Sequence, residues 1–422
     1  MDSLRFAPVS RRAFLRAGAL ALVSLGLDPL FLDRAAFARE PAAPGRRRVL
    51  VCLFQRGAVD GLSMIVPHGD PLYYRERPRI AIPADQALDL DGHFGLHPAL
   101  SGLLPMWRQG ALAPVLAVGS PDLTRSHFDA QDYMESGTPG VKATPDGWLN
   151  RYCQHQREHD ETPFRAVSFG PELPRILSGS APSLGIDNLR AFGLRAPNAT
   201  TRDRLTRAFE AMYSVAPTGI LASSAQEGFE AAKMLQKIAP DRYQPEHGAS
   251  YPNGRFGQSL QQIAQLIKAD VGLEIAFADV VGWDTHVNQG AEQGQLATRL
   301  GEFAQALAAF AQDLGDRMNN VVLVTCSEFG RTIAENGSTG TDHGRATAMM
   351  VMGGPVRGGR VLGPWPGLEP EARFEGRDLA VTTDFRDLFS EVLARHLHSG
   401  SLDAVFPGHE VAPKRYLGAL RA

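Results

Sequence analysis

The sequence predicts an α/β protein with a mostly parallel sheet flanked by helices. Two apolar runs of strand length, 49–54 and 321–326, hold almost no polar residue, which is typical of strands covered on both faces. The segment 291–315 has apolar residues at helical spacing, and it joins the run 273–281 to the run 321–326. A strand, a helix and a second strand in this order indicate a βαβ unit, and such units build parallel sheets covered by helices.

The expected strands are short apolar runs along the chain. In order they lie at 49–54, 112–118, 167–169, 184–186, 273–281, 321–326 and 347–352. The stretch 70–110 is rich in Pro and Gly and lacks a clear period. We therefore expect loops and short helices over the sheet in that stretch.

The expected helices have apolar residues three and four positions apart. The longest such stripe runs through Leu296, Leu300, Phe303, Leu307, Phe310 and Leu314, and a second runs through Phe256, Leu260, Ile263 and Ile267. Further helices are expected at 128–136, 201–213 and 225–238. We interpret the region around 187–270 as a helical insertion into a single α/β domain that spans 39–422.

The first 38 residues contain the three parts of a twin-arginine export signal. Arg11 and Arg12 form the arginine pair, the apolar run 17–27 follows, and Ala36-Phe37-Ala38 supplies the small residues that signal peptidase requires. The run is too short to cross a bilayer, which needs about 20 apolar residues. We therefore expect a removable signal, the twin-arginine translocase as a partner during export, no stable membrane span, and a periplasmic or extracellular location.

The composition is that of an ordinary globular protein, and it argues against several classes of site. The chain is 44% hydrophobic and 21% charged, with a formal net charge of -3. This mildly acidic balance gives no electrostatic footprint for nucleic acid, so we expect no nucleic-acid partner. The three cysteines, Cys52, Cys153 and Cys326, are an odd and sparse set, which argues against a disulfide framework. They contain no Cys-x-x-Cys pair, which argues against a thiolate metal site.

Polar side chains follow the expected strands, at the edge of the sheet where sites form in open α/β folds. Six of them are candidate metal ligands: Asp60, Asp284, His286, Glu328, Asp342 and His343. Carboxylates that converge without a cation would repel one another, so we expect one or two divalent ions among them, of zinc, manganese, magnesium or calcium. The alternative is that these residues cap helices and turns, as Asp beside Gly commonly does.

Three further residues are candidates for the reaction itself. Ser126 precedes the helix expected at 128–136, where a serine acts either as a helix cap or as a nucleophile. His127 is a metal ligand, a general base or a structural histidine. Arg331, with Arg125 as a second candidate, has the guanidinium geometry that matches phosphate or sulfate oxygens, and the alternative for both is an ordinary surface arginine.

Six short pieces of the chain resemble one family. They are Val-Asp-Gly-Leu at 59–62, Gly-Leu-His-Pro at 95–98, Ser-His-Phe at 126–128, Gly-Trp-Asp-Thr-His at 282–286, Ser-Glu-Phe-Gly-Arg-Thr at 327–332 and Asp-His-Gly at 342–344. In this order they are similar to the proteins grouped as domain of unknown function 1501, from about residue 47 to the C-terminus. Those proteins are typically exported by the twin-arginine route and are grouped with alkaline phosphatases and sulfatases. The resemblance implies an alkaline phosphatase-like three-layer sandwich with a mostly parallel central sheet.

The resemblance also implies roles for individual residues. Asp60 matches the metal-binding aspartate that follows the first strand, and Ser126 falls near the nucleophile position at the start of a helix. Asp284 and His286 match a metal-binding Asp and His, although their spacing is tighter. Where the superfamily usually has Asp-His after a later strand, this chain has Glu-Phe at 328–329.

One histidine ligand is therefore missing at 328–329, unless the Asp-His pair at 342–343 replaces it. This departure leaves two function hypotheses. The first is an exported metal-dependent hydrolase that acts on phosphate or sulfate esters of a small molecule or glycan. The second is a non-catalytic exported binding or assembly protein that keeps the fold and part of the site.

Overall fold

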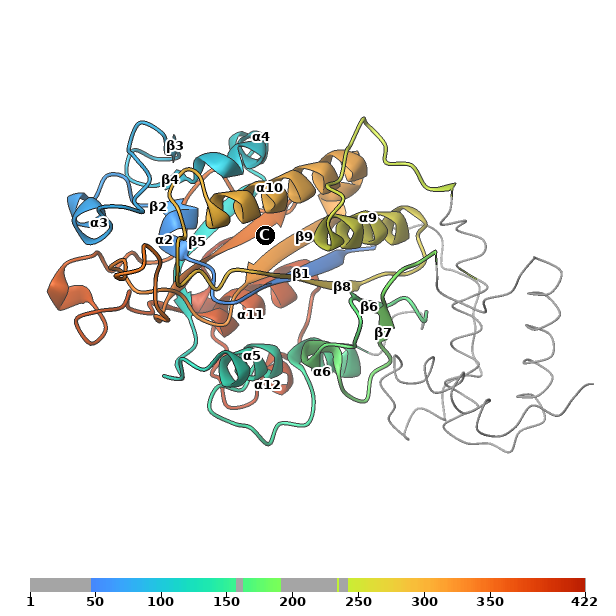
Figure 1. Cartoon of the computed structure of the whole chain (residues 1–422). Coiled ribbons are helices and arrows are strands. Elements are labelled where there is room, and N and C mark those ends of the chain that lie inside the picture. Colours follow the sequence, from blue (N-terminus) through green and yellow to red (C-terminus); the bar gives the residue numbers. More distant parts are fainter. Residues whose placement is uncertain (1–46, 157–161, 191–233, 235–241, 422) are drawn as a thin grey trace, which may run out of the picture.

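The computed structural model describes residues 47–156, 162–190, 234 and 242–421 (Figure 1). The expected export signal lies outside these residues, as do the helices expected at 201–213 and 225–238 apart from residue 234. Those expectations, and the division into one domain with an insertion, remain predictions. Among the helices of the described residues, none is both long and apolar enough to cross a membrane.

A mixed, mostly parallel sheet of eight strands forms the centre of the described structure. In spatial order its strands are β11 (Thr383–Asp384), β5 (Leu112–Gly119), β10 (Thr347–Gly353), β9 (Val321–Cys326), β1 (Val49–Arg56), β8 (Ile275–Val281), β6 (Ala166–Phe169) and β7 (Leu184–Ile186). Neighbouring strands run parallel, except that β10 runs antiparallel to both β5 and β9. The seven expected strands are all confirmed. The eighth, β11, has only two residues and therefore no apolar run that could reveal it.

The expected βαβ unit is present, with one strand inserted. It consists of β8, the helix α10 (Gln295–Leu314) and β9. β1 lies between β8 and β9 and pairs parallel with both, so that Leu50 is opposite Ile275 on one side and Val322 on the other. The three strands therefore end at the same edge of the sheet.

Helices lie on both faces of the sheet (Figure 1). One face carries α9 and α10, and the other carries α5, α6, α11 and α12. The remaining helix bounds are α2 (Gly61–Met64), α3 (Pro71–Glu76), α4 (Leu104–Arg108), α5 (His127–Ser136), α6 (Trp148–His155), α9 (Arg255–Lys268), α11 (Phe385–His396) and α12 (Leu402–Val405). Short 3-10 helices span Pro98–Leu103, Arg175–Leu177, Gly315–Asn320, Pro370–Ala372 and Pro413–Arg415.

The alternation of side chains along β1 explains why both faces need helices. Successive residues of a strand point to opposite faces, and all of those at the centre of β1 are apolar. Val51 joins a buried cluster that includes Phe303 of α10. Cys52, its neighbour, joins a second cluster that includes Trp148 of α6 and Phe389 of α11. Each face of the sheet is thus buried under its own set of helices.

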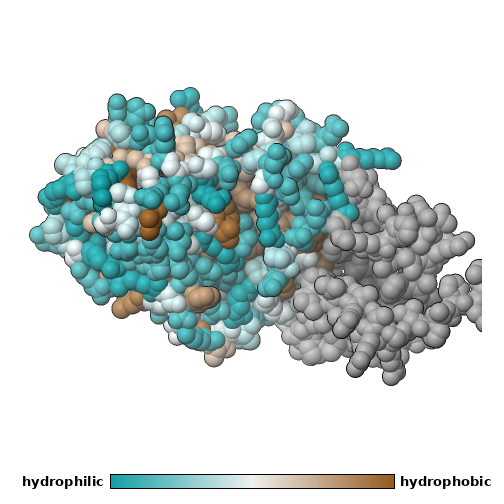
Figure 2. Space-filling model, in the orientation of Figure 1, coloured by the Kyte–Doolittle hydropathy of each residue, from teal (hydrophilic) through white to brown (hydrophobic). Residues whose placement is uncertain are grey.

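The stretch 70–110 contains short elements, as expected. α3 and α4 lie in it, and a small second sheet forms from the two-residue strands β2 (Ile65–Val66), β4 (Gly95–Leu96) and β3 (Leu88–Asp89). The face of the molecule seen in Figure 2 is mostly hydrophilic, with scattered apolar side chains. Scattered apolar residues are normal on a protein surface.

Candidate metal centre

The loops that follow β5, β8 and β9 bring most of the expected site residues together. His127 begins α5, Asp284 and His286 follow β8, and Glu328 follows β9. His343 lies between β9 and β10. Because β10 is antiparallel to β9, it starts at the edge where β9 ends, so the connection that carries His343 stays at that edge. The site therefore forms at the carboxyl ends of the parallel strands.

Three imidazole rings point the same nitrogen toward one another. Nε2 of His343 lies 3.0 Å from Nε2 of His127 and 2.9 Å from Nε2 of His286. The carboxylate of Asp284 lies beside them, with Oδ1 3.0 Å from Nε2 of His286 and 3.5 Å from Nε2 of His343. Its other oxygen is 3.6 Å from Nε2 of His127. Ligand atoms of His127, Asp284 and His343 all lie within 4.8 Å of one another.

The outer nitrogen of each ring is held by an oxygen acceptor. Nδ1 of His127 lies 2.7 Å from Oε1 of Glu328, and Nδ1 of His286 lies 3.1 Å from Oδ1 of Asp342. Nδ1 of His343 lies 2.9 Å from the carbonyl oxygen of Arg125. A carbonyl or carboxylate oxygen only accepts, so each Nδ1 carries a hydrogen. In the neutral rings, all three Nε2 atoms therefore present lone pairs to the same centre.

The two carboxylates behind the histidines are ionised at neutral pH. Burial tends to raise the pKa of Glu328, but hydrogen bonds from His127 and Gln131 outweigh it, and the pKa falls below its usual value. A hydrogen bond from Asn336 is the main cause that lowers the pKa of Asp342. Both residues were expected to be metal ligands. Their oxygens contact the outer nitrogens of His127 and His286, an arrangement that orients these rings, and a ligand role for either residue stays a prediction.

The residues that face the centre are only partly buried. The side chain of His127 is 23% exposed, that of His343 25% and that of Asp284 46%. The hydrogen bond with Glu328 is the main cause that raises the pKa of His127, whereas burial lowers the pKa of His343. Burial tends to raise the pKa of Asp284, but the ion pair with Arg331 outweighs it and lowers the pKa. Solvent, and a ligand of small size, can therefore reach an anionic and imidazole-rich centre.

Arg331 was expected to hold an oxyanion, but its guanidinium group contacts the protein's own oxygens. Its side chain is fully buried and donates to the carbonyl oxygens of Gly57, Ala58, Trp283 and Thr341. It also donates to Oδ1 of Asp284, and one terminal nitrogen lies 3.4 Å from Nε2 of His286. Its donors are thus engaged by the protein itself. In the described structure Arg331 fixes Asp284 and the neighbouring loops, and its role toward an oxyanion stays a prediction.

Ser126 occupies the N-cap position of α5, as one of the two alternatives proposed. Its backbone is extended, but its side chain makes no capping hydrogen bond. Its backbone N–H donates to the hydroxyl of Thr124. No hydrogen bond joins the Ser126 hydroxyl to any described residue of the centre, so its role as a nucleophile remains a prediction.

Asp60 lies in a separate buried network and not among the converging ligands. Its carboxylate accepts hydrogen bonds from Arg77 at 2.6 and 3.0 Å, from Ser63 at 2.8 Å and from Gln289 at 2.7 Å. Burial tends to raise the pKa of Asp60, but the charge of Arg77 outweighs it and lowers the pKa. Both oxygens of Asp60 are engaged in this network, and the expected ligand role of Asp60 stays a prediction. No sequence pattern marked Arg77 or Gln289, which lie in segments without periodicity.

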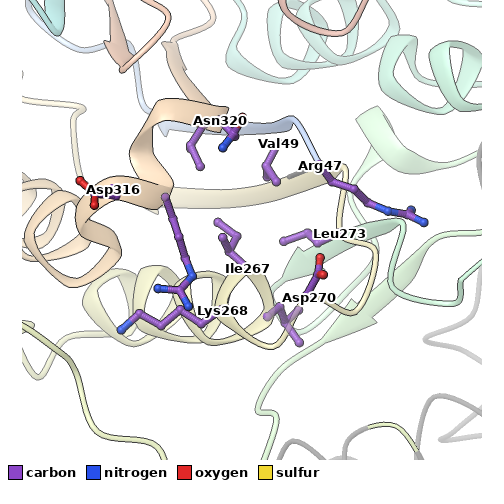
Figure 3. A pocket seen from close by; sticks show the side chains of 11 residues that line it. Arg47, Val49, Ile267, Lys268, Asp270, Leu273, Asp316 and Asn320 are labelled. Carbon is purple, nitrogen blue, oxygen red and sulfur yellow. The ribbon is translucent and has the colours of Figure 1, made fainter. Parts of the chain in front are cut away.

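Two cavities lie at opposite edges of the sheet. One of about 330 Å³ lies at the carboxyl ends of β1 and β8 and is lined by Arg56, Gln131 and Asp279 among others. Gln131 connects it to the centre through a 2.8 Å hydrogen bond with Glu328. The other, of about 430 Å³, lies at the amino ends of β1 and β9, and Figure 3 shows Lys268 and Asp270 in its wall. It is therefore at the edge remote from the histidines.

Comparison with known proteins gives distant structural similarities and one family. The lipoteichoic acid synthase LtaP from Listeria monocytogenes is 9% identical, with a TM-score of 0.28 over 80% of this chain and 71% of that chain. The PsFucS1 sulfatase from Pseudoalteromonas sp. is 12% identical, with a TM-score of 0.33 over 75% of this chain and 64% of that chain. Similarities this distant carry no argument about activity. No curated protein matches the chain. The model of one family matches residues 113–403, and the chain therefore belongs to the family described as "Protein of unknown function (DUF1501)".

Proposed function

We propose that the protein is a metal-dependent hydrolase whose centre holds a divalent ion through His127, His286, His343 and Asp284. The observation that carries this proposal is the convergence of three Nε2 atoms whose rings are fixed with the hydrogen on Nδ1. The Nε2 atom of His343 lies 3.0 Å from that of His127 and 2.9 Å from that of His286, and the lone pairs of these nitrogens repel one another unless a cation or a proton lies among them. Ligating histidines in metalloproteins are held in the same way, by a carboxylate or carbonyl on the outer nitrogen.

The donor set favours zinc among the ions expected from the sequence. Three imidazole nitrogens and one carboxylate suit zinc or a similar transition ion, whereas magnesium and calcium prefer oxygen ligands alone. The set is sufficient for one ion. A second ion would need ligands from beyond these four residues, since Asp60, Glu328 and Asp342 are engaged elsewhere.

The reaction we propose is hydrolysis of a phosphate or sulfate ester. A bound zinc ion would polarise the ester oxygen and lower the pKa of a water at the centre. The chain supplies the rest: Glu328 and Asp342 keep the two rings oriented, and Arg331 holds Asp284 in place. The partial exposure of the centre would let solvent and a small ester reach the ion, and a water would join the four protein ligands as a fifth ligand.

We also propose the finer features that the sequence predicted. The helices on both faces of the central sheet are compatible with an alkaline phosphatase-like three-layer sandwich. The twin-arginine signal at 1–38 would take the folded protein to the periplasm or beyond. Ser126 and the water of the centre are the two candidate nucleophiles.

The test is metal analysis of the purified protein followed by turnover of aryl phosphate and aryl sulfate. We expect one zinc ion per chain, and less than a tenth of that amount in Asp284→Ala and His343→Ala. Turnover should fall with the zinc content. Full zinc content in both variants would contradict the ligand assignment.

The arrangement of Ser126 and Arg331 favours a second candidate, the non-catalytic binding or assembly protein. Of the three residues expected to act in catalysis, Arg331 has its donors engaged by the protein itself, and Ser126 makes no hydrogen bond with the described residues of the centre. One zinc ion per chain with no turnover of any ester in a broad panel would support this candidate over the hydrolase.

A further inference from the structure

We infer that Gln289 is a positioning residue, which holds together the two loops that carry His286 and His343 and anchors them on the Asp60–Arg77 ion pair. The inference rests on the proposed metal centre. It gives a role to Asp60, which the sequence singled out and which the centre does not use. We name the two segments loop A, 284–289, and loop B, 338–343.

The amide oxygen of Gln289 joins the two loops. Gln289 is fully buried, and its Oε1 accepts hydrogen bonds from the hydroxyls of Thr285 at 2.7 Å and Thr341 at 3.0 Å. Thr285 lies between Asp284 and His286, and Thr341 lies two residues before His343. One side-chain oxygen therefore fixes both loops next to their ligands.

The amide nitrogen of Gln289 anchors the pair of loops on a rigid base. It donates to Oδ2 of Asp60 at 2.7 Å and to the hydroxyl of Ser63 at 3.2 Å. The ion pair of Asp60 with Arg77 is buried, with both side chains at most 1% exposed. Arg77 also donates to the carbonyls of Thr332 and Ile333, which extends the base to the segment after β9. A fully satisfied buried network of this kind is rigid.

The backbones of loops A and B are already in register, so the side chain of Gln289 sets the fine position. The N–H of Thr341 donates to the carbonyl of Thr285 at 3.1 Å, and that of Gln289 donates to the carbonyl of Thr339 at 2.9 Å. Gly340 allows this close approach, since a Cβ there would lie 2.3 Å from the carbonyl of His286. Loss of the Gln289 amide should leave the loops paired but free to shift by a fraction of an ångström.

His127 provides a comparison within the centre, because neither loop A nor loop B carries it, although its ring contacts His343 and Asp284. It is held by α5 and by Glu328, and in the described part of the chain no hydrogen bond or ion pair joins it to Gln289, Asp60 or Arg77. A disturbance of the network should therefore affect His286 and His343 first and His127 less, through its contact with His343. A general loss of stability would affect all three histidines.

The experiment compares Gln289→Leu with Gln265→Leu, a matched control. Gln265 is also a buried glutamine, in α9, and its amide nitrogen has no partner among the described residues. We expect zinc affinity, measured by competition with a chelator, to fall 10- to 100-fold in Gln289→Leu and to stay at the wild-type value in Gln265→Leu. Thr341→Val, which removes only one hydroxyl, should lose affinity by about three- to tenfold. Thr341→Val is the test variant to use if Gln289→Leu does not fold.

A second readout uses the zinc-free protein with ¹⁵N-labelled histidine. In Gln289→Leu we expect the imidazole signals of His286 and His343 to shift or broaden, while those of His127, which Glu328 holds, change less. If Gln289→Leu and Thr341→Val bind zinc as tightly as the wild type and leave all three rings unchanged, the positioning role is wrong and the metal centre stands. If the wild type binds no zinc, the proposed centre fails and the positioning role fails with it.

Discussion

Glu328→Gln tests whether the carboxylate behind His127 prepares that ring for a metal. Oε1 of Glu328 accepts three hydrogen bonds, from Nδ1 of His127 at 2.7 Å and from Gly57 N and Gln131 Nε2 at 2.8 Å each. A hydrogen bond to a charged group contributes about 1.5–3 kcal/mol and a neutral one about 0.5–1.5 kcal/mol, so the exchange weakens each bond by about 1 kcal/mol. The bond to His127 alone then implies about a fivefold loss of zinc affinity, just below the 10- to 100-fold typical of such partners.

The matched control for this variant is Glu391→Gln in α11. Glu391 is also fully buried, and its carboxylate also accepts three hydrogen bonds, from the backbone N–H groups of Leu417, Gly418 and Leu420. Both variants should lose about 1–3 kcal/mol of unfolding free energy in urea. Only Glu328→Gln should lose zinc affinity in a chelator competition. Equal zinc affinity in the two variants would refute the reasoning about His127.

Three more predictions concern stability. Arg77→Met leaves the Asp60 carboxylate buried without its partner, so we expect the free energy of unfolding in urea to fall by about 3–5 kcal/mol. The double variant Arg77→Met/Asp60→Leu should lose less. A double variant as unstable as the single one would argue against the ion pair. Burial lowers the pKa of His396 from 6.5 to about 4, so the unfolded chain binds the extra proton and stability should fall by about 3 kcal/mol as the pH drops from 6.5 to 4. His396→Gln should flatten that part of the pH profile, and an unchanged slope would contradict the assignment. Zinc at about 100 times its Kd should raise the unfolding free energy of the wild type by about 2.7 kcal/mol and leave Asp284→Ala nearly unaffected, as followed by the urea midpoint.

The strands and the longest helices could be predicted because they are buried on whole faces. A strand such as β1 has no exposed side that needs polar residues, so its apolar run is continuous and its bounds are clear. The helix α10 could be predicted for a similar reason, because one stripe of apolar residues along it faces the core. β11 and the small second sheet could not be predicted, because two-residue strands are set by their neighbours and leave no pattern.

The candidate centre could be predicted as a set of residues but not as a set of roles. Strand ends marked Asp284, His286 and His343, because parallel strands finish at one edge and their polar followers meet there. The sequence could not separate a residue that faces the centre from one that lies behind it. Asp342 contacts the outer nitrogen of His286, and Asp60 is paired with an arginine from a segment without any regular pattern. Those roles depend on side-chain directions that only the folded loops determine.

The most direct test is anomalous diffraction from crystals grown with zinc and measured at its absorption edge. We predict one strong peak per chain, in contact with the Nε2 atoms of His127, His286 and His343 and with a carboxylate oxygen of Asp284. Clear density for the three rings without a zinc peak among them, or a peak bound to other residues, would contradict the account.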